Sequence, residues 1–191
     1  MDALFAPAIA VARQASRAIG AMFFCVFGGA WLVLWAHDTF VLPLVAYALI
    51  GAATLVLFWI ALRVYKVHAP ALKAESDSQE KRRRSRGFHM VNAGQWVLMV
   101  VVANVLANIG LTTWIIPAAI FIVGAHFLPL AKLFEYPPHY ITGVAMMLLA
   151  AVYPWVAAAG ANSPTGCLGA GVILWSSSAW AITRTRSQNV A

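Results

Sequence analysis

Polar side chains inside long apolar runs are the residues of this sequence that could do chemistry, because a polar group in a bilayer is costly. The sharpest candidate is His126, which lies six residues before Lys132 and therefore about 9 Å from the end of its apolar run. An imidazole at this depth could relay protons, since small environmental changes move its titration across neutral pH. It could equally be neutral and hydrogen bonded to a neighbouring helix, and the sequence leaves both roles open.

A second set of polar candidates lies in the apolar run 91–109. Asn104 and Asn108 are one helical turn apart and share a face, and Gln95 lies about two and a half turns earlier, at an angle expected near that face. Hydrogen bonds between helices, worth about 0.6 kcal/mol on average and at most about 2, are the first interpretation, and a polar path is the alternative. The other residues that would line such a path are Tyr153, Ser176, Ser177 and Ser178.

Four of the five histidines are expected on one side of the membrane, where they would suit a transition metal or a haem. They are His68, His89, His126 and His139. The spacing predicts no ligand set, because the sequence has neither an H-x-x-H nor an H-x-x-x-H pair, and its two cysteines form no C-x-x-C motif. Independent histidines without a cofactor are therefore the first expectation, and a haem or a transition metal is the alternative.

The motifs of common enzyme classes are missing from the sequence. No Asp or Glu lies within the long apolar runs, since Asp38 and Glu135 are at their edges, which disfavours a carboxylate-driven pump. The sequence also lacks a phosphate-binding G-x-x-x-x-G-K-[ST], a zinc-binding H-E-x-x-H and a nucleophilic G-x-S-x-G. No catalytic residue is assigned, and the lack of these motifs favours a protein that is not an enzyme.

Five cations lie within six residues of the polar segment 66–88. They are Lys81, Arg82, Arg83, Arg84 and Arg86. Beside an apolar run, such a cluster is typical of an orientation signal and of a ligand for anionic lipid, at roughly 1 kcal/mol per residue. Nucleic acid is a disfavoured partner, because no aromatic side chains are interleaved with the cations.

The elements that must position these residues are helices long enough to cross a bilayer. The chain has 191 residues, of which 62% are hydrophobic and 10% charged, well below the quarter that soluble domains carry. Apolar runs of about 20 residues without alternation predict helices and exclude a membrane barrel. The expected fold is an all-α integral membrane protein, a bundle of six transmembrane helices over residues 19–36, 41–62, 91–109, 114–131, 141–159 and 166–182.

The distribution of charge predicts the orientation of this bundle. With six spans, all 13 Lys and Arg residues lie on one side of the membrane. The positive-inside rule therefore predicts both termini in the cytoplasm, in a bacterial-type inner membrane. The expected partners are the bilayer, anionic lipid head groups, and a second copy or another membrane protein.

One membrane domain is expected in five stretches: an interfacial segment (1–18), spans one and two (19–65), a polybasic cytoplasmic loop (66–88), spans three to six (89–183) and a tail (184–191). Three functions fit this organisation. The first is passage of a small solute or ion along a polar path near His126. The second is a non-catalytic membrane scaffold or accessory subunit, and the third is a histidine-ligated redox protein.

Overall fold

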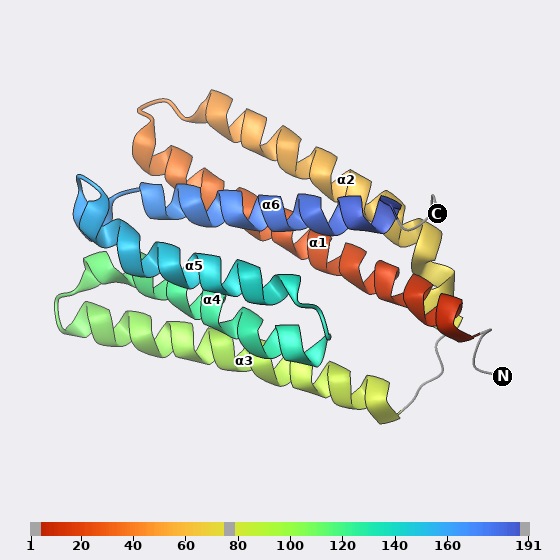
Figure 1. Cartoon of the computed structure of the whole chain (residues 1–191). Helices are drawn as coiled ribbons and strands as arrows, with labels where there is room; N and C mark the ends of the chain where they lie inside the picture. The colour runs from red at the N-terminus through yellow and green to blue at the C-terminus, as the bar shows by residue number, and fades with distance from the viewer. Residues whose placement is uncertain (1–4, 75–78, 188–191) are drawn as a thin grey trace.

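The structure is a computed structural model that describes residues 5–74 and 79–187, and the side chains of residues 14–70, 79 and 82–183 within them. The described chain consists of six long α-helices joined by short turns (Figure 1). These are α1 (Phe5–Thr39), α2 (Leu44–Ala74), α3 (Gln79–Asn108), α4 (Ile115–Leu133), α5 (Pro138–Val156) and α6 (Thr165–Ser187), with 3₁₀ turns η2 (Thr112–Trp114) and η3 (Gly160–Asn162).

Each of the six helices, α4 together with the preceding turn η2, provides a segment of 19 to 27 residues that is long and apolar enough to cross a membrane. The segments are Gln14–Thr39, Leu44–Pro70, Arg82–Asn108, Thr112–Leu133, Pro138–Val156 and Thr165–Thr183. Helices satisfy their own backbone hydrogen bonds, which is the requirement for an element that crosses hydrocarbon. The prediction of an all-helical chain with six such helices is confirmed.

The helices are arranged as a row in which each packs mainly on its neighbours (Figure 1). From one end of the row to the other, the order is α2, α1, α6, α5, α4 and α3. The row does not follow the sequence, because α6 inserts between α1 and α5. Helices α2 and α3, which are consecutive in the chain, therefore stand at opposite ends of the molecule.

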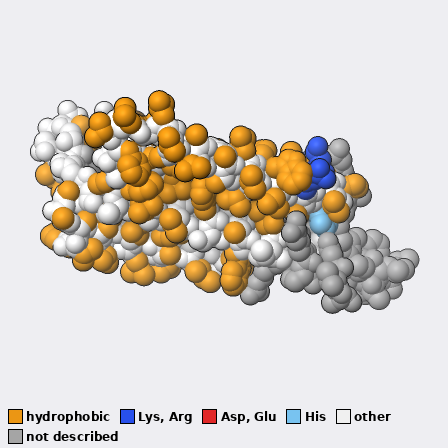
Figure 2. All heavy atoms as spheres, turned by 90° about the horizontal axis from the view of Figure 1, so that it is seen from above, with side chains coloured by type: hydrophobic (Ala, Val, Ile, Leu, Met, Phe, Trp, Pro, Cys, Tyr) orange, Lys and Arg blue, Asp and Glu red, His pale blue; other side chains and the backbone are white. Residues whose placement is uncertain are grey.

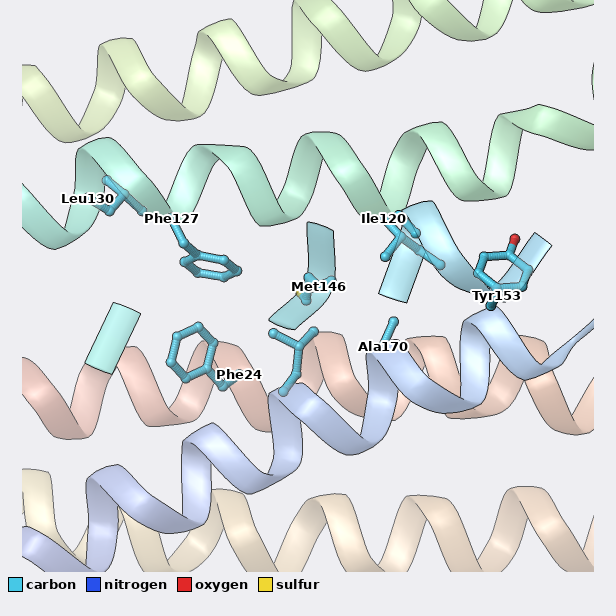
Figure 3. Close-up of a cluster of buried hydrophobic side chains, with 9 residues drawn as sticks. Phe24, Ile120, Phe127, Leu130, Met146, Tyr153 and Ala170 are labelled. Atoms are coloured by element: carbon cyan, nitrogen blue, oxygen red, sulfur yellow. The ribbon is translucent and has the colours of Figure 1, made fainter. Parts of the chain in front are cut away.

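The largest cluster of buried side chains lies between α1, α4, α5 and α6 (Figure 3). Its members are Phe24, Ile120, Phe127, Leu130, Met146, Ala150, Tyr153, Ala170 and Leu174. The rings of Phe24 and Phe127 meet edge to face with their centroids 5.3 Å apart, an arrangement that aromatic quadrupoles favour. Helices α2 and α3 contribute no member to this cluster of buried residues.

Close backbone contacts hold two of the helix pairs together. A Cβ atom added to Gly143 of α5 would lie 2.7 Å from the Gly124 carbonyl oxygen of α4, and one added to Gly171 of α6 would lie 2.9 Å from the Gly28 carbonyl oxygen of α1. Membrane helices associate through packing rather than through the hydrophobic effect, so small residues at a crossing strengthen the contact.

The helices extend further than the sequence predicts. The segment 66–88 was expected as a polar loop, but α2 continues to Ala74 and α3 begins at Gln79. Within this segment, residues 75–78 lie outside the described chain. Lys, Arg, Glu and Gln are strong helix formers, and extending an existing helix needs no new nucleus. Residues 1–18 were expected as a separate interfacial segment, but α1 is continuous from Phe5, with Pro7 tolerated in its first turn.

The described cations gather at one end of the bundle along the direction of the helix axes, called here the basic end. Because consecutive helices alternate in direction, the start of α1 and the end of α6 lie at this same end (Figure 1). The face seen in Figure 2 is apolar over most of its length, with Lys, Arg and His side chains at one end only. Apart from the basic end, this face of the molecule is therefore apolar.

Candidate functional site

A pocket lined by several polar side chains lies near the basic end, between α1, α5 and α6. Its volume is about 200 Å³. It is lined by Phe24 of α1, by His139 and Thr142 of α5, and by Ser176, Ser177 and Trp180 of α6. A pocket that combines aromatic walls with a few convergent polar groups is the usual form of a small-molecule site.

Two hydroxyl groups form the polar floor of this pocket. The Thr142 and Ser177 hydroxyl oxygens lie 2.8 Å apart. Each hydroxyl also lies close to a carbonyl one turn earlier in its own helix, Thr142 at 3.1 Å from Pro138 and Ser177 at 2.8 Å from Ile173. Both hydroxyls are therefore satisfied within the protein, and what they still offer a ligand is acceptor capacity.

His139 forms one wall of the pocket and is held by aromatic contacts. Its ring meets Phe24 and Tyr136 edge to face, with centroids 5.6 and 4.9 Å away. Its Nδ1 atom is buried, and no hydrogen-bond partner for it is found among the described residues. A buried nitrogen without a partner is an unusual feature that a bound water or ligand would satisfy.

His126 lies beside this site rather than in it. Its ring is stacked obliquely on Phe127 at 4.3 Å, and Phe127 in turn contacts the His139 ring at 5.9 Å. The Nδ1–H of His126 donates to the Val123 carbonyl at 2.6 Å, because a carbonyl can only accept. This bond ties the imidazole to its own helix and leaves Nε2 as the free acceptor of a neutral ring.

A cation stands at the mouth of the pocket. The Arg17 guanidinium lies over the Tyr136 ring, 5.1 Å from its centroid, in a cation–π contact. Arg17 and Phe24 are seven residues apart on α1 and so point to the same side of that helix. Arg17 thus lies beside the pocket, in contact with Tyr136, which lines it.

The remaining residues expected on a polar path lie elsewhere. Tyr153 is buried toward the opposite end of the core, where its hydroxyl donates to the Ala161 carbonyl at 3.3 Å (Figure 3). Ser178 donates to the Ala21 carbonyl of α1 at 2.9 Å and joins two helices. Of the predicted set, Ser176 and Ser177 line the pocket, and the apolar cluster lies between them and Tyr153.

Two amide side chains of α3, Asn104 and Asn108, face away from the bundle. Asn104 and Asn108 are exposed, and each donates to the carbonyl four residues earlier in its own helix at 2.8 Å. Gln95 does not share their face as expected. Gln95 precedes Asn104 by nine residues, and a rotation of about 100° per residue places the two side chains on opposite sides of the helix. The buried Oε1 atom of Gln95 accordingly lies on the side of α3 that packs on α4.

The histidines considered as metal ligands do not converge. His68 donates its Nδ1–H to the Val64 carbonyl at 2.7 Å, and His89 is exposed beside Phe88. Within the described part of the chain, no group of three or more His, Cys, Asp or Glu side chains is placed to hold a metal ion. Of the basic cluster, Arg82, Arg83 and Arg86 are exposed on the first turns of α3, and the side chain of Lys81 lies outside the described residues.

The site contains residues that the sequence reasoning did not single out, chiefly Thr142 and Phe24. The spacing of His139 and Thr142, three residues apart on one helix face, could have pointed to this site. Comparisons of the chain with protein-family models, with curated proteins and with solved structures gave no match. Function is therefore inferred from the geometry of the chain itself.

Proposed function

We propose that this protein is a non-catalytic membrane partner, a subunit that works by packing against another membrane-embedded chain. The observation that carries the proposal is the exposure of the two helices at the ends of the row. None of the apolar segment of α3 and 6% of that of α2 is buried, against 33–44% for the other four helices. The outward sides of these two helices are thus left for partners or lipid.

The polar groups on α3 favour a protein partner over lipid tails. The side chains of Asn104 and Asn108 use one N–H each for a bond within the helix, and their side-chain oxygens have no partner among the described residues. An amide that faces hydrocarbon loses hydrogen bonds that water or protein would supply. A neighbouring helix with polar groups at the same depth would restore them.

The interior of the bundle supports packing rather than passage. In the described spans, several polar side chains bond to backbone carbonyls, among them Ser178, His126 and Trp175. The apolar cluster of Phe24, Met146, Leu174 and their neighbours fills the space between the pocket at the basic end and Tyr153. A solute path would need polar groups through that layer.

The proposed setting is the inner membrane of a bacterial-type cell, with the basic end and both termini in the cytoplasm. All 13 Lys and Arg residues of the sequence belong to segments at that end, as the positive-inside rule requires of a cytoplasmic face. Exposed Arg82, Arg83 and Arg86 would bind anionic head groups there.

The proposal is tested by comparing size and flux. In mild detergent extracts of its own membrane, the protein should migrate in a complex larger than its 20.6 kDa chain. The purified chain in proteoliposomes should pass protons and glycerol no faster than empty liposomes. A chain that migrates alone in the extract and conducts in proteoliposomes would contradict the proposal.

A second candidate, passage of a small solute, is favoured by one observation, the pocket with the unpartnered His139 Nδ1 and the paired hydroxyls of Thr142 and Ser177. In that case the pocket is the inner mouth of a path closed by Phe24 and Phe127. Flux in proteoliposomes that is lost on His126→Ala, in a variant with an unchanged far-UV spectrum, would establish passage and replace the first proposal.

A further inference from the structure

We infer that α3 packs against α3 of a second copy of this chain, through a stripe of side chains that includes Asn104. The inference rests on the proposed function, since it names the chain that covers one of the two exposed helices. The stripe consists of Met90, Ala93, Val97, Val100, Asn104 and Ala107, and is called the Asn104 stripe below.

The first argument is the spacing of the stripe. Its six residues are separated alternately by three and four positions, the pattern that keeps one seam of a helix facing a partner in a left-handed pair. All six are exposed, although five of them, all but Asn104, are apolar. They lie opposite the side on which Gln95 and Met99 face α4.

The second argument is the position of the amide. Asn104 lies four residues before the end of α3, so it is about 6 Å inside the apolar segment, and its side-chain oxygen has no partner among the described residues. In a pair of helices, one asparagine at such a seam position fixes register and partner number through a side-chain hydrogen bond. Val97 and Val100 on one side and Ala107 on the other would enclose that bond.

The third argument selects a second copy over another protein. An asparagine amide is both donor and acceptor, and is therefore its own complement. Two copies of one chain share their orientation in the membrane, so a two-fold axis along the bilayer normal brings Asn104 of each copy to the same depth. Ala93 and Ala107 are small enough to let the two backbones approach.

The cations of α3 do not oppose this pairing strongly. Arg82, Arg83 and Arg86 precede the stripe and lie at the basic end, outside the apolar layer, where they are exposed. Charges in contact with water and head groups are screened within about 8–10 Å at physiological salt. Anionic lipid held between the two sets of arginines would reduce their repulsion further.

Disulfide cross-linking of the full chain in liposomes tests the geometry. In a background without the two buried cysteines, Cys25→Ala with Cys167→Ala, we expect Val97→Cys and Val100→Cys to give homodimers on oxidation. Leu98→Cys is the matched control, because Leu98 is exposed but lies about 120° from the stripe on the same helix. Equal cross-linking at all three positions would mean random collision and would overturn the inference.

The role of the amide is tested separately by energy transfer between labelled copies over a range of protein-to-lipid ratios. Asn104→Leu should weaken dimerisation about 3- to 20-fold, the effect of one interhelical hydrogen bond in a membrane, whereas Asn104→Gln should keep most of it. Because the only hydrogen bond of the Asn104 side chain in the described chain is to its own helix, neither change should alter the unfolding of the single chain. An unchanged dimer in Asn104→Leu would contradict this role.

The outcomes also separate this inference from the proposed function. A cross-linked product between the stripe and a different protein, in native membranes, would overturn the second copy and leave the membrane-partner function standing. A monomer at every protein-to-lipid ratio would show that lipid covers α3, and would overturn the inference. The partner function would then be judged by the size of the native complex, which α2 could still support.

Discussion

The crossing of α4 and α5 gives the sharpest prediction of stability. Gly143→Ala would place a Cβ atom 2.7 Å from the Gly124 carbonyl oxygen, 3.2 Å from Phe127 Cβ and 3.3 Å from Leu128 Cδ2. Two of these atoms belong to backbone or Cβ positions, which cannot rotate away. The two helices must therefore separate or slide, and no side-chain rearrangement avoids this movement.

The size of the effect follows from that geometry. Ordinary van der Waals contact begins at 3.4 Å, so the Cβ is about 0.7 Å too close to the carbonyl oxygen. If the two helices move 0.5–1 Å apart, each atom pair at their interface loses roughly a quarter to a half of its van der Waals attraction. Overpacking of this kind typically costs about 1–3 kcal/mol, which is the loss expected in the free energy of unfolding.

The measurement is equilibrium unfolding by SDS in mixed micelles, followed by tryptophan fluorescence. Gly51→Ala is the matched control, because a Cβ at Gly51 of α2 meets nothing within 4 Å and should change the unfolding free energy by less than about 0.5 kcal/mol. Gly124→Ala should resemble Gly143→Ala, since its Cβ would lie 2.8 Å from the Gly143 carbonyl oxygen. If Gly143→Ala and Gly51→Ala have the same stability, the reasoning from the close crossing is refuted.

Three further predictions concern packing and orientation. Ser178→Ala should lower the unfolding free energy by about 0.6 kcal/mol, and by at most about 2, because it removes the hydrogen bond to the Ala21 carbonyl. Ser176 is exposed, and Ser176→Ala should have no such effect. Leu174→Ala should cost on the order of 1–3 kcal/mol in the same assay, since Leu174 is 1% exposed, and Leu148→Ala, at a residue 59% exposed, should cost less than about 0.5. In intact cells, a membrane-impermeant maleimide should label Ala159→Cys but label Ser85→Cys only after permeabilisation; the reverse pattern would invert the proposed orientation.

The number and type of the helices could be predicted from the sequence because the bilayer imposes both. A run of about 20 apolar residues has few alternatives in hydrocarbon, so residues such as 114–131 and 166–182 indicate a helix without any knowledge of its neighbours. The helix ends were predicted less well. Outside the bilayer, helix propensity decides, and a lysine- and arginine-rich stretch such as 81–86 continues a helix although its composition resembles a loop.

The site could be predicted only in part, because the order of helices in the row is not encoded in the order of the chain. Ser177 was a candidate from its type alone, but its partner Thr142 is 35 residues away and meets it only because α6 lies beside α5. In contrast, the nine-residue spacing of Gln95 and Asn104 was enough to predict that they lie on opposite sides of a helix. The packing of α4 determines which side of α3 is covered, and this packing could not be predicted from the sequence.

The position of α6 in the row has a consequence for how the protein is made. Trp175 donates to the Cys25 carbonyl across 150 residues, and Ser178 to the Ala21 carbonyl across 157. At about 5–20 residues per second, α1 waits on the order of 8–30 s for this partner. Until then the chain consists of an α1–α2 pair and an α3–α4–α5 group that share few contacts. A ribosome that stops after α5 would therefore leave two loosely associated groups of helices, and synthesis of the last helix is the step that joins them.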